Sequence, residues 1–224
     1  MARQFSVTEI TTPGWNDLEL ARRIAAGDQA AFIALMRRYN RMLYRAARSV
    51  LKAEGEVEDA LQEAYLRAYG CIGQFRGEAR LSTWLVRIVL NEALARVRRV
   101  NGAAGLFPAV DSAATPEIPE HYAQRTEMRR LLQARIDALP DTLRRVFVLR
   151  ALEELPVDDV AAALGIPQAM VRMRFFRAKR LLRKALARDI ELPLARVFPF
   201  AGRRCAGTVA AVLARVATMR PGVA

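Results

Sequence analysis

Basic side chains are the most prominent chemistry in this sequence, and they are densest near its C-terminal third. No Asp or Glu occurs between Gln168 and Arg188, a stretch that holds Arg172, Arg174, Arg177, Lys179, Arg180, Arg183, Lys184 and Arg188. Guanidinium and ammonium groups at this density favour phosphate as the ligand, so we expect this stretch to bind nucleic acid. The alternative is a solvated cationic helix on an ordinary helical bundle.

A second candidate group combines aromatic rings, cations and an amide between Phe75 and Arg99. Its members include Trp84, Arg87, Asn91, Arg96, Arg98 and Arg99. Rings stack on unpaired bases while cations follow the phosphates, so this mixture suits single-stranded nucleic acid. A lone tryptophan can also belong to a core. The loop Phe75-Arg76-Gly77 beside Thr83-Trp84 favours the binding interpretation.

A third group is acidic and lies in an otherwise basic chain. Asp59, Gln62 and Glu63 are spaced i, i+3 and i+4, so on a helix they point the same way. The residues around them add three glutamates against a single cation, namely Glu54, Glu56 and Glu58 against Lys52. Some of this charge suits a helix N-terminus. From the residues alone, either a solvated face or a surface for a basic protein partner explains the group.

Residues that could support catalysis or bind a metal do not form any known pattern. Cys71 and Cys205 lie far apart without a CxxC motif, and His121 is the only histidine. No zinc-deaminase HxE...CxxC pattern, P-loop or carboxylate cluster with ligand-like spacing occurs. We therefore expect no enzyme, no metal site, no cofactor and no small-molecule substrate.

Composition supports a polyanionic partner. The chain has 224 residues, with 36 Lys and Arg against 23 Asp and Glu and a net charge of +13. The N-terminal MARQFSVTEITTPGW lacks the apolar core of a signal peptide, and no apolar run reaches the roughly 18 residues that a membrane span needs. We expect a soluble, cytoplasmic protein with reduced cysteines.

Helical periodicity runs through the first half of the chain. After a leader, residues 1–16, we expect a short helix over Asp17–Ala26 and a cap at Asp28 for the next one. That next helix is long, because apolar residues recur at helical spacing at Phe32, Leu35, Met36, Tyr39, Leu43, Ala46, Ala47 and Val50. A third helix follows Gly55, with Val57, Leu61, Ala64, Tyr65 and Ala68 buried. After a polar loop over 76–82, a fourth helix buries Leu85, Ile88, Val89 and Leu94.

Residues 101–125 are expected to form a flexible linker between two small helical domains. Its first 20 positions, NGAAGLFPAVDSAATPEIPE, hold Gly, Pro and small residues without a helical stripe, and fully extended they reach roughly 65–70 Å. The first domain then covers 17–100 and the second 126–189. Two helices, with Leu131, Leu132, Ile136 and Leu139 and then Leu143, Val146, Phe147 and Ala151, should open the second domain.

A helix-turn-helix is predicted at the end of the second domain. Val160, Ala161 and Leu164 form one apolar set, Gly165-Ile166-Pro167 breaks it, and Val171, Phe175, Ala178 and Leu182 form the next. Gly165 can adopt the positive φ that ends a helix, and Pro167 suits the first turn of the following one. The fold class is therefore all-α.

The C-terminal extension, residues 190–224, contains a predicted amphipathic helix. Val209, Val212, Leu213 and Val216 share one face of it. Three roles stay open for this helix: it folds back on its own domain, docks on a regulator, or lies on an anionic membrane.

Taken in order, these segments resemble the extracytoplasmic-function (ECF) sigma factors, the minimal form of the bacterial RNA polymerase sigma-70 family. The resemblance covers roughly Leu18 to Ala187. It is carried by AGDQAAFIALMRRYNRMLYRAAR, EDALQEAYLRAY, FRGEARLSTWLVRIVLNEALARVRR and LPDTLRRVFVLRALEELPVDDVAAALGIPQAMVRMRFFRAKRLLRKAL. It implies a sigma region 2-like first domain, a sigma region 4-like second domain, and core polymerase, promoter DNA and an anti-sigma factor as partners.

The resemblance also implies roles for particular residues. Asp59, Gln62 and Glu63 would dock on the clamp helices of the polymerase β′ subunit, and the β flap is a second expected contact. The −10 element would be recognised and melted by Arg76, Arg80, Ser82, Thr83, Trp84, Arg87 and Asn91. The −35 element would be read in the major groove by Gln168, Arg172, Met173, Arg174, Phe176 and Arg177.

Two features depart from the family pattern. Members often carry a small polar residue where Met173 stands, so promoter specificity cannot be transferred to this chain. Residues 190–224 lie beyond the usual minimal chain, and we hypothesise that they belong to anti-sigma control. The rival interpretation is a helix-turn-helix regulator that acts without joining polymerase.

Overall fold

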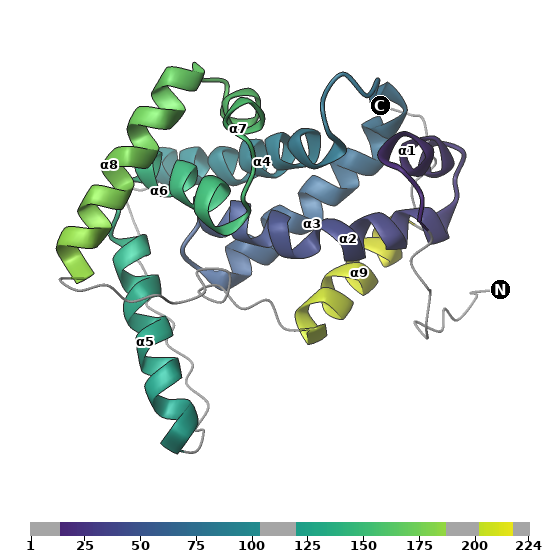
Figure 1. Ribbon diagram of the computed structural model, residues 1–224. Coiled ribbons are helices and arrows are strands. Elements are labelled where there is room, and N and C mark those ends of the chain that lie inside the picture. Colours follow the sequence, from purple (N-terminus) through teal and green to yellow (C-terminus); the bar gives the residue numbers. More distant parts are fainter. Residues whose placement is uncertain (1–13, 104–119, 187–201, 217–224) are drawn as a thin grey trace.

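The computed structural model describes residues 14–103, 120–186 and 202–216, and every regular element in these ranges is a helix (Figure 1). The all-α prediction is therefore confirmed. Most of the predicted leader, the centre of the predicted linker, Arg188 and residues 190–201 and 217–224 lie outside the described residues, as do the side chains of His121 and Cys205.

The first module consists of four α-helices and one short 3₁₀ turn. They are α1 (Asp17–Ala25), α2 (Gln29–Arg48), α3 (Glu54–Cys71), η1 (Ile72–Gln74) and α4 (Leu81–Ala103). The helix starts follow local side-chain chemistry. Asn16 accepts a hydrogen bond from the Glu19 backbone N–H at 2.9 Å, and Asp28 accepts one from that of Ala31 at 3.1 Å. The predicted cap at Asp28 is confirmed.

The Asp28 cap should contribute measurably to stability. A hydrogen bond from Arg23 holds the pKa of Asp28 below its usual value, so its contribution is present above pH 3.8 and is lost as the pH falls through the lowered value. We expect Asp28→Ala to lower the free energy of unfolding by about 1 kcal/mol at neutral pH. Urea unfolding measures this loss, with Gln29→Ala as the matched neighbour. An unchanged midpoint in Asp28→Ala would contradict it.

The predicted apolar stripes form the core of the first module. Of the α2 stripe, Phe32, Leu35, Met36, Leu43, Ala46 and Ala47 are buried, while Tyr39 and Val50 are half-buried. The Phe32 ring meets Tyr65 of α3 edge-on, with ring centroids 6.3 Å apart. All five predicted core residues of α3 are buried. Leu85 and Val89 of α4 are buried too, whereas Ile88 and Leu94 are only partly covered.

The second module has four α-helices and one short π-helix. They are α5 (Glu120–Asp137), α6 (Asp141–Phe147), η2 (Val148–Leu152), α7 (Val157–Leu164) and α8 (Gln168–Leu186). Its own core contains Leu132, Ile136, Leu139, Phe147, Val148, Leu152, Ala178 and Leu182. Leu131, which shares the predicted apolar set of this helix, is 40% exposed, because its neighbours Leu132 and Ile136 occupy the inner side of α5.

The predicted helix-turn-helix is present as α7, a turn and α8. Gly165 lies in the left-handed region, with φ 63° and ψ 38°, and its N–H donates to the carbonyl of Ala161. Pro167 directly precedes α8, and its carbonyl accepts from the N–H of Val171 at 3.2 Å. The glycine therefore ends α7 and the proline introduces α8, as the turn sequence predicts.

The two modules pack against each other. Helix α7 lies on α4, and second-module residues join the buried cluster of the first module, namely Val146, Leu149, Leu155, Val160, Ala163 and Val171. Arg45 of α2 forms a 2.9 Å ion pair with Glu153, with side chains 3% and 7% exposed. Burial raises the pKa of Glu153, and the hydrogen bond from Arg45 opposes that rise. The contact therefore contains a desolvated charge pair as well as apolar surface.

Two more arginines cross the contact between the modules. Arg48 forms two bonds with the Asp137 carboxylate, at 3.0 and 2.7 Å. The buried Arg144 donates from Nε to the carbonyl of Ser49 at 2.8 Å, and its other nitrogens donate to the backbone carbonyl of Asp137 and to the carboxylate of Asp141. The sequence analysis assigned no role to these two arginines, and together with Arg45 they form hydrogen bonds across the contact.

The edges of the predicted linker are helical. Helix α4 continues through Ala103 and α5 begins at Glu120, so helix extends into both ends of the 101–125 segment. Helix α9 (Gly202–Val216) matches the predicted amphipathic helix: Val209, Val212, Leu213 and Val216 are all buried. It lies on α2 and α3 of the first module (Figure 1), not on the adjacent second module.

In the part of the chain that the structure describes, no helix combines the length and apolar character needed to cross a lipid bilayer. The same residues contain no group of three or more His, Cys, Asp or Glu side chains that could hold a metal ion.

Candidate nucleic-acid interface

Helix α8 presents a basic surface with one large exposed ring. Arg172 and Arg177 are exposed, and Phe176 is 63% exposed, which is exceptional for a phenylalanine. Gln168 accepts a hydrogen bond from Arg172 at 3.0 Å, so the amide and the guanidinium are held together at the start of the helix. Met173 and Arg174 are half-buried. An exposed amide, cations and a ring on one helix can contact base edges and phosphates in a major groove.

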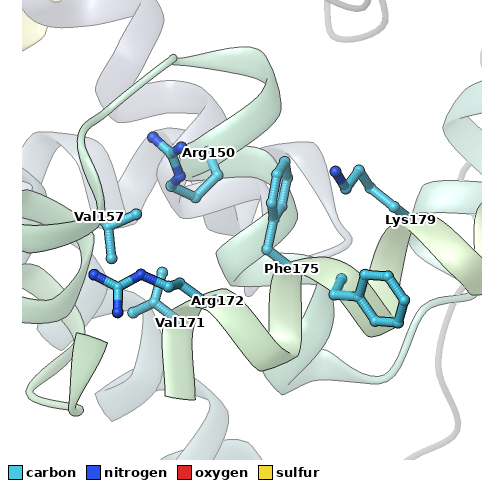
Figure 2. A pocket seen from close by; sticks show the side chains of 7 residues that line it. Arg150, Val157, Val171, Arg172, Phe175 and Lys179 are labelled. Atoms are coloured by element: carbon cyan, nitrogen blue, oxygen red, sulfur yellow. The ribbon is translucent and has the colours of Figure 1, made fainter. Parts of the chain in front are cut away.

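Phe175 anchors this surface to the rest of the module. Its ring packs against Phe147, with centroids 6.2 Å apart. Figure 2 shows the ring between Arg150 and Lys179, whose cationic groups lie 5.6 and 4.6 Å from its centroid. Both cations border a small pocket that Val157, Val171 and Arg172 also line. They add positive charge beside the predicted −35 surface.

Arg150 was not among the predicted site residues, and Lys179 was predicted as part of the basic stretch but not as a −35 contact. Lys179 follows Phe175 by four positions, so helical spacing alone could have placed them together. Arg150 comes from η2 and Arg145 from α6, and only the tertiary fold brings these elements to α8. Burial lowers the pKa of Arg145, Asp141 opposes this, and Arg174 lowers it further. Helix α6, which carries Arg145, packs directly on α8.

The aromatic and cationic group of the first module lies at the start of α4. Trp84 is half-buried and packs on Phe75, with ring centroids 5.7 Å apart. Arg76 and Arg80 are exposed in the preceding loop, and Arg87 and Asn91 are exposed further along the helix. Asn91 borders an open hollow whose other polar lining residues are Arg67, Glu92, Arg98 and Arg99. The hollow offers cations and an amide to a phosphate chain.

Two predicted members of the α4 group have little access to solvent in this structure. Thr83 is 3% exposed, so its hydroxyl has no access to DNA, and Ser82 is half-buried. Arg80 lies 3.7 Å from the carboxylate of Asp159 on α7. One end of the surface is therefore in contact with the second module.

The acidic group lies on α3, and its two carboxylates lie close to two different arginines. Asp59 is 60% exposed and lies 3.6 Å from Arg96, which also pairs with Glu56 at 3.2 Å. Glu63 forms a 2.8 Å ion pair with Arg215 of α9, and Gln62 is half-buried. The three predicted docking residues share one helix, but only Asp59 is largely open to solvent.

The fold and these surfaces define a two-module, all-helical DNA-binding protein whose first module also carries an acidic surface. The family profile of Sigma-70 region 2 matches residues 35–102, and that of Sigma-70, region 4 matches residues 129–182. The RNA polymerase sigma-H factor of Pseudomonas aeruginosa is 35% identical over 181 residues, covering 76% of this chain and 93% of that protein.

Another relative and a solved structure agree with these matches. The ECF RNA polymerase sigma factor SigW of Bacillus subtilis is 33% identical over 179 residues, covering 75% of this chain and 95% of SigW. The structure of CnrH in complex with the cytosolic domain of CnrY matches with a TM-score of 0.59 at 29% identity, covering 78% of this chain and 99% of that one. The chain belongs to the ECF sigma factors of the sigma-70 family and is an RNA polymerase sigma factor.

Proposed function

We propose that this sigma factor uses three separate surfaces. Asp59, Gln62 and Glu63 dock on core polymerase, the loop and helix from Arg76 to Asn91 bind and open the −10 element, and α8 reads the −35 element. The observation that carries this assignment is the division of charge: an acidic surface on α3 and a basic one on α8. An acidic protein surface repels DNA and suits a basic protein partner, whereas α8 suits phosphate.

The −10 role is supported by the chemistry around Trp84. Unstacking a base costs a few kcal/mol, and stacking on a ring together with hydrogen bonds can offset that cost. Trp84 supplies a ring, Arg87 and Asn91 supply donors, and Arg76 and Arg80 supply charge for the phosphates. The buried Thr83 fits a positioning role, because its side chain faces the core.

The −35 role is supported by the exposed side of α8. Gln168 and Arg172 can offer hydrogen bonds to base edges, and Phe176 can pack on a thymine methyl group. Arg174 and Arg177 can contact the flanking phosphates, which position the helix without reading sequence. Lys179 and Arg150 add charge beside them.

Removing one phosphate contact should change the salt dependence of DNA binding by a fixed amount. For holoenzyme on promoter DNA, we expect Arg177→Ala to reduce the slope of log K against log salt concentration by about 0.9. Fluorescence anisotropy at several salt concentrations measures the slope. The control is Arg22→Ala, an exposed arginine on α1 that should leave the slope unchanged. An unchanged slope for Arg177→Ala would remove this residue from the interface.

Several consequences follow for the protein in the cell. It acts as an initiation factor without enzymatic activity of its own, and it works in the cytoplasm with core polymerase. A protein inhibitor of the anti-sigma type is a further proposed partner. Its support is the family membership together with the solved complex of CnrH with the cytosolic domain of CnrY.

The rival function is a helix-turn-helix regulator that never joins polymerase. Co-migration of the purified chain with bacterial core polymerase on size-exclusion chromatography separates the two functions. The sigma assignment predicts a stable complex in the absence of DNA. Binding to promoter DNA without any complex with core polymerase would favour the regulator.

A further inference from the structure

Helix α9 buries its apolar side on the first module. Thr208, Val209, Val212, Leu213 and Val216 are buried, whereas Gly207, Ala210 and Ala214 on the other side are exposed. The four buried hydrophobic residues belong to the same buried cluster as α2 and α3. Figure 1 shows α9, in yellow, alongside these two helices. The helix is therefore an integral layer of the first module in this structure.

The same helix also engages the acidic group of α3. Arg215 donates from Nη1 to Glu63 Oε1 at 2.8 Å, across 152 positions in the sequence. Glu63 is one of the three residues proposed to dock on core polymerase. Helix α9 thus places a cation where a basic partner surface would place one.

Helix α9 is an addition to the part of the chain that defines the family. The region 4 match ends at residue 182, and α9 begins at Gly202. Both matched regions lie within α1–α4 and α5–α8, so α9 belongs to neither of them. Its packing on α3 therefore calls for an explanation beyond the shared fold.

We propose that α9 is an intramolecular competitor of core polymerase that covers the docking surface on α3 until polymerase displaces it. This inference rests on the proposed docking role of Asp59, Gln62 and Glu63. A tethered helix binds its own surface at an effective concentration of about millimolar, so even a modest apolar contact is well populated. If polymerase binds only the open form, its apparent Kd equals the intrinsic Kd divided by the open fraction.

The charge pattern allows displacement to begin at one end. Asp59 is 60% exposed and pairs only loosely with Arg96, at 3.6 Å, whereas Glu63 is in direct contact with Arg215. A basic polymerase surface can first engage Asp59 and then compete with Arg215 for Glu63. The competitor therefore weakens docking without preventing it.

The test compares full-length variants that alter α9 and leave α3 intact. Val212→Asp places a carboxylate at a fully buried position and should release the helix, whereas Ala214→Asp adds the same charge on the exposed side. We expect Val212→Asp to bind core polymerase at least about tenfold more tightly than the natural chain. In the natural chain α9 is released in about one tenth of the molecules or fewer, whereas in Val212→Asp it is released in all of them. Ala214→Asp should bind as the natural chain does. Kd is measured by fluorescence anisotropy or interferometry.

Hydrogen exchange of the amides in 207–216 reports release independently of polymerase. Val212→Asp should raise this exchange and Ala214→Asp should not. A milder variant, Arg215→Glu, keeps the apolar contact and opposes Glu63 with a like charge, so it should tighten core binding by a factor of about two to five. This variant keeps the test decisive if Val212→Asp disturbs the fold of the module.

The outcomes separate this inference from the proposed function. Binding of the natural chain to core polymerase with no gain in either Val212→Asp or Arg215→Glu would overturn the competitor role alone. Unchanged exchange in Val212→Asp would also overturn it, because the helix would then not be held by its apolar side. Failure of every chain, natural and variant, to bind core polymerase would instead refute the docking assignment.

Discussion

Replacing both Asp59 and Glu63 with arginine is expected to weaken binding to core polymerase by at least about a hundredfold and to abolish promoter-specific transcription. Two acids on an outward side of α3 become two cations facing a basic partner surface, and like charges in an interface cost several kcal/mol. The fold should persist because the Asp59 side chain is 60% exposed and that of Glu63 is 41% exposed. Affinity is measured by titration of labelled core polymerase, and circular dichroism verifies the fold.

The control for this result is Glu19→Arg, which makes the same acid-to-arginine reversal at a single position on α1. Helix α1 contacts η1, at the opposite end of α3 from Asp59, so core binding should be unaffected. The double variant also places a cation opposite Arg215 and so weakens the contact between α9 and α3. Loss of binding could then not be caused by a more tightly held α9. Retained promoter-specific transcription by the double variant would refute the assigned docking surface.

The second large effect concerns the contact between the modules. Glu153→Ala removes the carboxylate that lies 2.9 Å from the buried Arg45, and breaking a buried ion pair costs about 3–5 kcal/mol. The pair joins α2 to Glu153, which follows the π-helix η2 of the second module. Its loss therefore destabilises the contact between the modules and not either helical core. We expect the modules to separate, with a larger radius of gyration in small-angle X-ray scattering.

A neighbouring glutamate provides the control for this separation. Glu154 is exposed, and Glu154→Ala should change stability by no more than about 0.5 kcal/mol and leave the scattering curve unchanged. Thermal unfolding gives a second measurement, since separated modules should unfold in two transitions. A single transition and an unchanged radius of gyration in Glu153→Ala would show that the pair does not hold the modules together.

The features that were predictable from sequence are governed by neighbouring residues. The α2 stripe follows from helical spacing, the Asp28 cap from a short polar side chain before an apolar run, and the end of α7 from the positive φ that Gly165 tolerates. The buried side of α9 was predictable for the same reason. Each signal lies within a few positions of the feature it predicts.

The features that were missed depend on residues far apart in the chain. Arg45 and Glu153 are 108 positions apart, and the sequence alone predicts that both are surface charges. Helical spacing predicts that α9 has an apolar side, but it does not identify which module covers that side. Thr83 reads as a polar residue beside Trp84, and only the packing of α4 shows that it is 3% exposed. Tertiary packing decides all three.

The most direct test of the central claim is in vitro transcription with purified core polymerase over a library of genomic promoter fragments. As a sigma factor that reads two elements, the chain should direct initiation at a limited set of fragments, and these should share one motif near −10 and another near −35. The Asp59 and Glu63 double variant should direct none. Transcripts that start at the same positions with and without the chain would contradict the account.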